Sequence, residues 1–314
     1  MTNAEIKRTF EELGPTPRII QLLNDPFELE QYKLAVDAAI SGITPDGLRK
    51  MVSDARSLSL DKSKLGLVSR IERDILPSAH TVSPITESIK SRLALQLRIA
   101  SRNEQIELYT LFSKSPQTKK MCGTLFEAIG LCVVPEGLSI TLLPMVRLSR
   151  SSNTKSRPRW YTSHAPLLNE TLEAKRKEAL HQSQTIKFPP TTIQEFKANE
   201  ILSLCEGVFY IPVSEIQEAL DVFLLLNGIL YILQFTVGQK HSIRPGFVDF
   251  LQKCQHVPPL EEWKFVFLIP PRITLVCPEP KSELPGLCNL NPYSAEIDLR
   301  PYLTRLTNSA VHHS

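Results

Sequence analysis

The sequence lacks the apolar segments that mark membrane-spanning and exported proteins. Its longest apolar stretch, residues 222–235, is interrupted by Asn227 and Gly228 and is shorter than the ~20 apolar residues of a transmembrane helix. Residues 1–14 mix charged and apolar side chains and contain no apolar segment of signal-peptide length. We therefore expect an intracellular protein, in the cytoplasm or the nucleus, without a membrane partner.

Closely spaced cysteines and the common short catalytic motifs are also missing. None of the six cysteines belongs to a C-x-x-C pair, and a structural zinc site usually contains such pairs. Buried free thiols in a reducing compartment are therefore expected rather than disulfides. The sequence has no G-x-x-x-x-G-K-[ST], G-x-G-x-x-G, H-E-x-x-H or G-x-S-x-G, which argues against the enzymes that depend on those motifs.

Composition and charge are those of an ordinary globular protein. The 314 residues, 42% hydrophobic and 22% charged, can bury a sizeable core in one large domain or two ordinary ones. The net charge of +3 is too small to indicate a nucleic-acid partner. Residues 145–190, however, contain nine basic and three acidic side chains, so this segment is +6 and the remainder about −3.

The basic segment interleaves cationic and aromatic side chains at residues 155–164, KSRPRWYTSH. In one interpretation these residues bind nucleic acid, with cations neutralising phosphates and aromatic rings stacking on unpaired bases. The candidates are Lys155, Arg157, Arg159, Trp160 and Tyr161. In the alternative, the segment is an exposed basic loop whose aromatic side chains anchor it to the core.

Apolar periodicity and turn residues predict a helical amino-terminal region. Helices are expected at residues 3–12, 16–24, 27–41, 44–57 and 65–75. After a boundary near residue 80, Ser83 and Pro84 predict the cap and first residue of a further helix. Another helix is expected over residues 104–112, and Ser115 with Pro116 predicts the start of one that runs to about residue 134.

The remainder of the sequence predicts a mixture of strands and helices. Strands are expected at residues 138–148, 208–213, 263–271 and 273–278. A charged, exposed helix at residues 169–183 and a Pro/Thr-rich link lie between the first two strands, and a short helix is expected from about residue 244 to 254.

The strongest local signal is a β-hairpin over residues 219–237. Asn227-Gly228 suits a type I′ turn, whose two central residues both have positive φ. Residues whose numbers sum to 455 then face each other, which places Asp221 opposite Gln234 and Thr236 two residues further along the same face. These polar groups need partners, because burying one unpaired costs roughly 2–7 kcal/mol.

This hairpin resembles that of the metal-dependent PD-(D/E)XK nucleases, in which Asp and Glu/Gln-x-Lys occupy these positions. The predicted order from residue 115, helix, strand, insertion, hairpin, helix and strand, is similar to their αβββαβ core. The resemblance implies bound Mg²⁺, held by Asp221, Gln234 and Glu127 as catalytic and metal-binding residues. Thr236 stands at the position of the motif lysine, which leaves enzymatic activity open, and Lys240 and His241 are the candidates to replace that lysine.

Simpler interpretations of the same three residues remain. Glu127 also suits a solvated helix face, and Asp221 suits a residue that enters a strand and pairs with a nearby base. Gln234 also suits an amide that satisfies neighbouring backbone groups.

Longer stretches resemble the carboxyl-terminal region of fungal proteins of the Crinkler and retrotransposon-hot-spot type. These stretches are LGPTPR (13–18), SPITESIKSRLALQLR (83–98), GTLFEAI (123–129), RWYTSHAPLLN (159–169), ALDVFLLLNGILYILQFTVGQKHSIRPGFVDF (219–250), EEWKFVFLIPP (261–271), ITLVCPEP (273–280) and PYSAEIDL (292–299). Members of that group typically carry a P-loop NTPase ahead of a nuclease-like domain. The first 75 residues here resemble the helical tail that follows the ATPase.

We therefore expect an α+β protein with a helical region at residues 1–80 and a restriction-endonuclease-like domain at residues 81–302. A basic insertion at residues 149–205 and a disordered tail at residues 303–314 complete the expected organisation. The expected function is that of a nuclease-like effector or mobile-element-derived protein that binds nucleic acid, and weak Mg²⁺-dependent hydrolysis is left open by Thr236. The alternatives are a catalytically inactive module that binds nucleic acid or a host protein, and a truncated remnant of an ATPase–nuclease protein.

Overall fold

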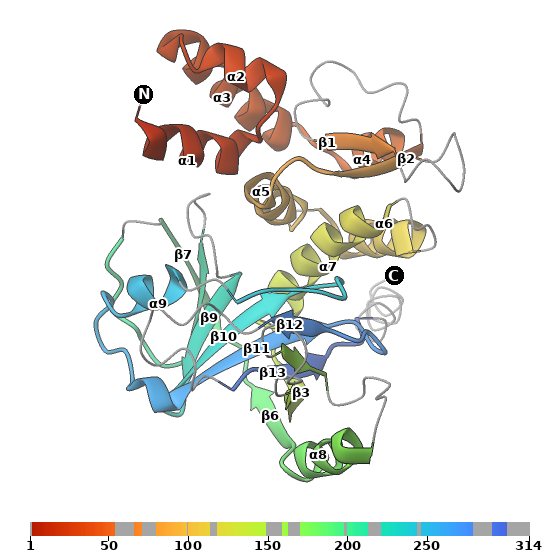
Figure 1. Cartoon of the computed structure of the whole chain (residues 1–314), viewed down its shortest axis with the longest axis vertical. Coiled ribbons are helices and arrows are strands. Elements are labelled where there is room, and N and C mark those ends of the chain that lie inside the picture. Colours follow the sequence, from red (N-terminus) through yellow and green to blue (C-terminus); the bar gives the residue numbers. More distant parts are fainter. Residues whose placement is uncertain are drawn as a thin grey trace, which may run out of the picture. The chain divides into compact units, whose positions relative to one another are not determined.

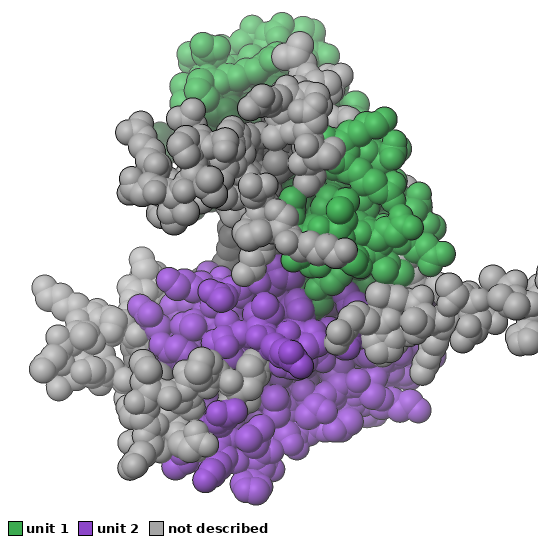
Figure 2. Space-filling model, turned by 90° about the vertical axis from the view of Figure 1, so that its right-hand side faces the viewer, with its two compact units in different colours: residues 1–131 green, residues 132–314 purple. Residues whose placement is uncertain are grey.

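The protein folds as a mixed α+β structure in two compact units, which divide between Leu131 and Cys132 (Figures 1 and 2). The computed structural model describes residues 2–53, 66–70, 80–98, 100–113, 118–148, 159–162, 170–197, 200–212, 221–243, 246–278 and 291–299. Ser115, Pro116 and the predicted tail at residues 303–314 lie outside these ranges. Within the ranges, no helix has both the length and the apolar character needed to cross a membrane.

Unit 1 is mainly helical. Its elements are α1 (Asn3–Leu13), α2 (Pro17–Leu22), α3 (Pro26–Ser41), α4 (Pro45–Ser53), β1 (Gly66–Arg70), β2 (His80–Pro84), α5 (Glu87–Leu97), α6 (Arg102–Ser113) and α7 (Lys119–Val133), whose last two residues belong to unit 2. Polar caps followed by proline start α2 and α3, with Thr16 and Asp25 accepting hydrogen bonds from backbone N–H groups of the first turn. The first four predicted helices are therefore confirmed over the described residues, which do not include residues 54–57.

The prediction for residues 65–75 and for the start of α5 is wrong in part. Residues 66–70 form strand β1, which pairs with β2, and Ser83 and Pro84 belong to β2. Thr86 caps α5 instead, because its hydroxyl accepts a hydrogen bond from the Ile89 N–H and donates one to the Glu12 carbonyl oxygen. This second hydrogen bond joins segments 74 residues apart, so periodicity within α5 could not reveal it.

A shared core explains why unit 1 extends far beyond the boundary predicted near residue 80. Ile89 and Leu93 of α5 and Leu125 of α7 are buried in one cluster with Leu13 and Val36 of the amino-terminal helices. Burial of these apolar faces is worth roughly 1.5–3 kcal/mol for each fully buried side chain. The helices that follow residue 80 are therefore part of the first unit.

Unit 2 contains a mixed eight-stranded sheet and a smaller three-stranded sheet. The large sheet has the order β6-β3-β13-β11-β10-β9-β8-β7, and the small one the order β12-β5-β4. The strands are β3 (Leu138–Pro144), β4 (Val146–Leu148), β5 (Arg159–Tyr161), β6 (Gln184–Phe188), β7 (Thr192–Phe196), β8 (Val208–Pro212), β9 (Val222–Leu226), β10 (Ile229–Phe235), β11 (Trp263–Ile269), β12 (Val276–Pro278) and β13 (Tyr293–Glu296). The helices are α8 (Glu170–His181), α9 (Gly246–Leu251) and the 3₁₀ helix η3 (Leu260–Glu262).

The large sheet is strongly curled. Its two edge strands, β6 and β7, are joined by residues 189–191 alone, so Phe188 and Thr192 lie at most ~14 Å apart. In a flat sheet the seven strand intervals would separate these edges by ~34 Å. Contacts across the concave side agree: the Phe188 ring lies 5.4 Å from that of Tyr231, and the Lys264 Nζ donates to the Gln184 Oε1 at 2.7 Å. The predicted Pro/Thr-rich link thus forms two strands and bends the sheet.

Four neighbouring strands and one helix form a βββαβ succession within this sheet. Strands β8, β9 and β10 are antiparallel neighbours, and α9 leads from β10 to β11, which runs parallel to β10. The succession differs from the predicted one, because β8 rather than β3 lies next to the hairpin. Phe247 and Leu251 of α9 pack in one core with Phe223 of β9, Ile232 of β10 and Phe265 of β11.

Candidate functional site at the carboxyl ends of β10 and β11

The predicted hairpin is confirmed, including its register. Asn227 and Gly228 have φ values of 53° and 74°, and the strands pair Leu226 with Ile229 and Val222 with Leu233. Every pair in this ladder sums to 455, and one further step in the same register places Asp221 opposite Gln234.

Asp221 is fixed by a hydrogen bond to the neighbouring strand. Its Oδ2 accepts from the Phe235 N–H at 2.6 Å. The next N–H, that of Thr236, donates to Leu268 on β11, so the Phe235 N–H points toward β9. The carboxylate therefore continues the hydrogen-bond ladder just before β9 begins, and charge-assisted hydrogen bonds of this kind are short and strong.

Gln234 is a buried polar side chain with an unsatisfied oxygen. It is 7% exposed, and its Oε1 has no hydrogen-bond partner among the described residues. It shares the face of β10 that carries Leu230 and Ile232, and its neighbour on β11 is Phe267. An unpaired buried carbonyl oxygen is costly, so this position suits a bound water, cation or hydrogen-bond donor.

The loop that follows β10 pairs with the segment that follows β11. It carries Lys240 and His241, the two residues expected to replace the motif lysine. Val276 donates its N–H to the Gln239 carbonyl oxygen at 2.9 Å and accepts the His241 N–H at 3.1 Å. The His241 ring lies 5.7 Å from the ring of Phe267, the strand neighbour of Gln234, and the Lys240 side chain is exposed. Both residues therefore lie at the end of the sheet where Gln234 is found.

Thr236 itself offers no positive charge at this edge. Its buried hydroxyl accepts a hydrogen bond from the Gly238 N–H at 3.1 Å and so stabilises the turn that follows β10. The side chain has a local structural role at the position where the nuclease motif has lysine.

Glu127 belongs to the other unit. It lies on α7, is 2% exposed, and forms an ion pair with Lys90 of α5 at 3.2 Å. It is therefore not on a solvated helix face, which was the simpler interpretation of its position. Among the described residues, no group of three or more His, Cys, Asp or Glu side chains could hold a metal ion.

The oxygen ligands in unit 2 are suited in kind to a hard cation. Mg²⁺ prefers carboxylate, carbonyl and water oxygens, and it is often held by one or two carboxylates together with substrate phosphates. Asp221 would supply the carboxylate, and the unsatisfied Oε1 of Gln234 the carbonyl oxygen. We assign these two residues as the candidate ligands.

The structure describes three of the five residues predicted to bind nucleic acid. Arg159, Trp160 and Tyr161 form β5, the central strand of the small sheet, whereas Lys155 and Arg157 lie outside the described residues. Trp160 is 1% exposed and packs in the core, so its ring is not available to stack on a base; the core-anchoring interpretation holds for it. Arg159 is exposed.

Two other elements of unit 2 also carry exposed basic side chains. Arg147 on β4 is exposed, and its carbonyl oxygen accepts a hydrogen bond from the Lys175 Nζ of α8 at 3.4 Å. The predicted charged helix is thus confirmed as α8 and packs beside β4.

Sequence patterns missed one cationic residue at the same end of the sheet. Arg272 follows β11 after two prolines, has a φ of 66°, and donates its N–H to the Glu296 Oε1 at 3.1 Å. Only glycine or asparagine would have signalled positive φ at this turn, so no pattern pointed to it.

The candidate site thus combines a fixed carboxylate, an unsatisfied amide oxygen and exposed cationic side chains where parallel strands end. Open α/β sheets commonly bind ligands at the carboxyl ends of their strands. Oxygen donors and cationic side chains are the groups that divalent cations and phosphates, respectively, bind in proteins. Comparisons of the chain with protein-family profiles, curated proteins and solved structures find no match, so the assignment depends on the geometry.

Proposed function

We propose that unit 2 is a nuclease-like domain of the restriction-endonuclease type that binds nucleic acid, with slow or no hydrolysis of its own. The resemblance of the sequence to Crinkler and retrotransposon-hot-spot proteins extends the proposal to an effector or mobile-element-derived role. The observation that most supports this proposal is the register of the hairpin, which brings Asp221 and Gln234 to the same end of a βββαβ succession.

The chemistry follows from the side chains at this edge. Asp221 and Gln234 would hold Mg²⁺, and the bound ion would activate a water molecule and stabilise the leaving oxygen. Asp221 is the one carboxylate that the hairpin contributes, so metal binding depends chiefly on its charge. The hydroxyl of Thr236 cannot stabilise a developing negative charge as an ammonium group does. Hydrolysis is therefore expected to be slow.

A catalytically inactive nucleic-acid-binding module is the second candidate. Thr236 in place of the lysine favours it, as does the absence of a three-residue metal-binding group among the described residues. Binding with a steep salt dependence but no metal-dependent cleavage would distinguish this candidate from a nuclease.

The test compares the unaltered protein with Asp221→Asn on plasmid DNA and on single-stranded RNA, with and without Mg²⁺ or Mn²⁺. Asparagine keeps an oxygen that can accept the Phe235 N–H, so the hairpin should persist while the charge of the site is lost. We expect any metal-dependent cleavage to fall by at least about 100-fold, since a site with a single charged ligand binds Mg²⁺ weakly without it.

Asp249→Asn is the matched control, because Asp249 is an exposed carboxylate on α9. Its cleavage rate should equal that of the unaltered protein. Equal cleavage by Asp221→Asn and the unaltered protein would remove the nuclease assignment from this hairpin. Absence of nucleic-acid binding by the unaltered protein would contradict both candidates.

A further inference from the structure

The turn after β11 has an unusual residue at its third position. Ile273 donates its N–H to the Pro270 carbonyl oxygen at 3.4 Å, which closes a four-residue turn over residues 270–273. Proline at the second position requires negative φ there, and Arg272 at the third has a φ of 66°. This combination is that of a type II turn, in which the third position favours glycine or asparagine.

Arginine at this position strains the backbone, whereas glycine would adopt the same conformation without strain. Its Cβ makes positive φ unfavourable, and the backbone is kept in place by the hydrogen bond from the Arg272 N–H to Glu296 at the end of β13. Strained backbone at an ordered turn is a common feature of functional sites, where a particular side chain is needed. The Arg272 side chain is exposed and, among the described residues, makes no hydrogen bond or ion pair.

The turn places the Arg272 side chain at the edge of the sheet that holds the candidate site. Strands β10, β11 and β13 run parallel, so the turn lies at the same edge of the sheet as Gln234 and Thr236. The segment after the turn continues to Val276, which pairs with the loop that carries Lys240. Arg272 is therefore held on a closed turn at the same edge of the sheet as Thr236, which stands where the nuclease motif has lysine.

We propose that Arg272 binds a phosphate of the nucleic acid at this edge and supplies the positive charge that Thr236 does not. The guanidinium group presents donors in a planar fork that matches a phosphate. This inference rests on the proposed function, since it names the residue that contacts the ligand of that same site.

The test measures the affinity of Arg272 variants for a fluorescein-labelled 20-base-pair DNA duplex and for single-stranded RNA, over a range of salt concentrations. Arg272→Gly removes the charge from a backbone that glycine adopts freely, so the turn and the thermal stability should be retained. We expect the affinity for the duplex to fall roughly five- to ten-fold at 0.1 M salt and the slope of log K against log[salt] to decrease by about 0.9. Arg272→Lys should keep the slope.

Lys253→Gly is the control, because Lys253 is exposed and follows α9 on the path to the start of β11. It should leave both affinity and slope unchanged. An unchanged slope in Arg272→Gly beside normal binding by the unaltered protein would overturn the assignment of Arg272 alone. Equal losses in Arg272→Gly and Lys253→Gly would show a general effect of charge and would also overturn it. No binding by the unaltered protein would overturn the proposed function together with it.

Discussion

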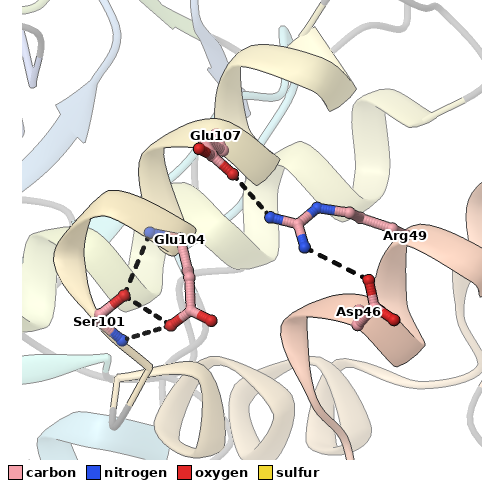
Figure 3. Close-up of polar contacts among 5 residues, drawn as sticks. All are labelled: Asp46, Arg49, Ser101, Glu104 and Glu107. Carbon is pink, nitrogen blue, oxygen red and sulfur yellow. Dashed lines mark hydrogen bonds and ion pairs between the residues drawn. The ribbon is translucent and has the colours of Figure 1, made fainter.

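The two units use their charged side chains differently. In unit 1, charges link helices: Arg49 of α4 contacts Glu107 of α6 at 2.7 Å, and Lys90 of α5 pairs with the buried Glu127 of α7 (Figure 3 shows the Arg49 contacts). At the carboxyl ends of the strands in unit 2, the Gln234 oxygen has no partner among the described residues, and Arg272 makes no ion pair there. Charged side chains thus pair with one another in the first unit, whereas this edge of the second unit holds an amide oxygen and a cationic side chain without a partner among the described residues.

This difference separates Glu127 from the other two predicted ligands. A buried carboxylate paired with lysine is costly to disturb, because removing one partner leaves the other charge buried and uncompensated. Asp221 and Gln234 instead lie at the edge of a sheet, where one has a backbone partner and the other an unsatisfied oxygen. Glu127 is thus buried and paired with Lys90 inside unit 1.

Trp160 tests whether the basic strand β5 belongs to the core or to the binding surface. Trp160→Ala should lower the free energy of unfolding by about 3–5 kcal/mol, because it removes a fully buried ring from the core of unit 2. Chemical denaturation measures this effect, and Trp160→Phe should recover a large part of it. A loss of nucleic-acid affinity at unchanged stability would show instead that the ring stacks on bases.

The pH dependence of stability tests whether Cys277 is buried in the same core. Burial raises the pKa of its thiol from 9.0 to about 12, so the thiol stays protonated in the folded protein while it ionises in the unfolded chain. The protonated thiol makes its full contribution to the free energy of unfolding below pH 9. That contribution is lost as pH rises toward 12, by up to about 4 kcal/mol at ~1.4 kcal/mol per pKa unit.

The measurement compares the unfolding free energy of the unaltered protein and of Cys277→Ala at several pH values between 8 and 11. The difference between the two proteins should shrink as pH rises. A difference that does not change with pH would mean that the Cys277 thiol is accessible and titrates normally.

Lys90 tests the charge pairing of unit 1. Lys90→Met should destabilise the protein by about 3 kcal/mol, because Glu127 would lose its cationic partner in a buried position. The double variant Lys90→Met with Glu127→Leu should regain most of that stability, which a denaturation-based double-mutant cycle would show. Additive losses would mean that the two side chains do not depend on each other.

The basic segment should give the smallest effect on stability and a clear one on binding. Replacing Lys155, Arg157 and Arg159 by alanine should leave the free energy of unfolding nearly unchanged. It should lower nucleic-acid affinity and flatten the salt dependence of binding, because fewer counterions are released when fewer phosphates are contacted. Filter binding at several salt concentrations measures both quantities. Unaltered affinity would show that this segment does not contact nucleic acid.

Local turn chemistry predicted the hairpin, and tertiary packing decided most of what the sequence could not predict. Asn227-Gly228 determines both the turn and the register, because both residues adopt positive φ. The extent of unit 1 depends on contacts between α5 and the amino-terminal helices, which no window of sequence contains. Arg272 adopts positive φ against its own preference, so the site residue that the sequence missed is one that violates a local rule.

The most direct test of the proposed metal site is to locate the divalent ion that binds in the presence of nucleic acid. Mn²⁺, added in small amounts to protein labelled for nuclear magnetic resonance, broadens signals near its binding site. We expect the broadening to be centred on the Gln234 side-chain amide and the Phe235 backbone amide. Broadening centred on Glu127, or none at Gln234 and Phe235, would contradict it.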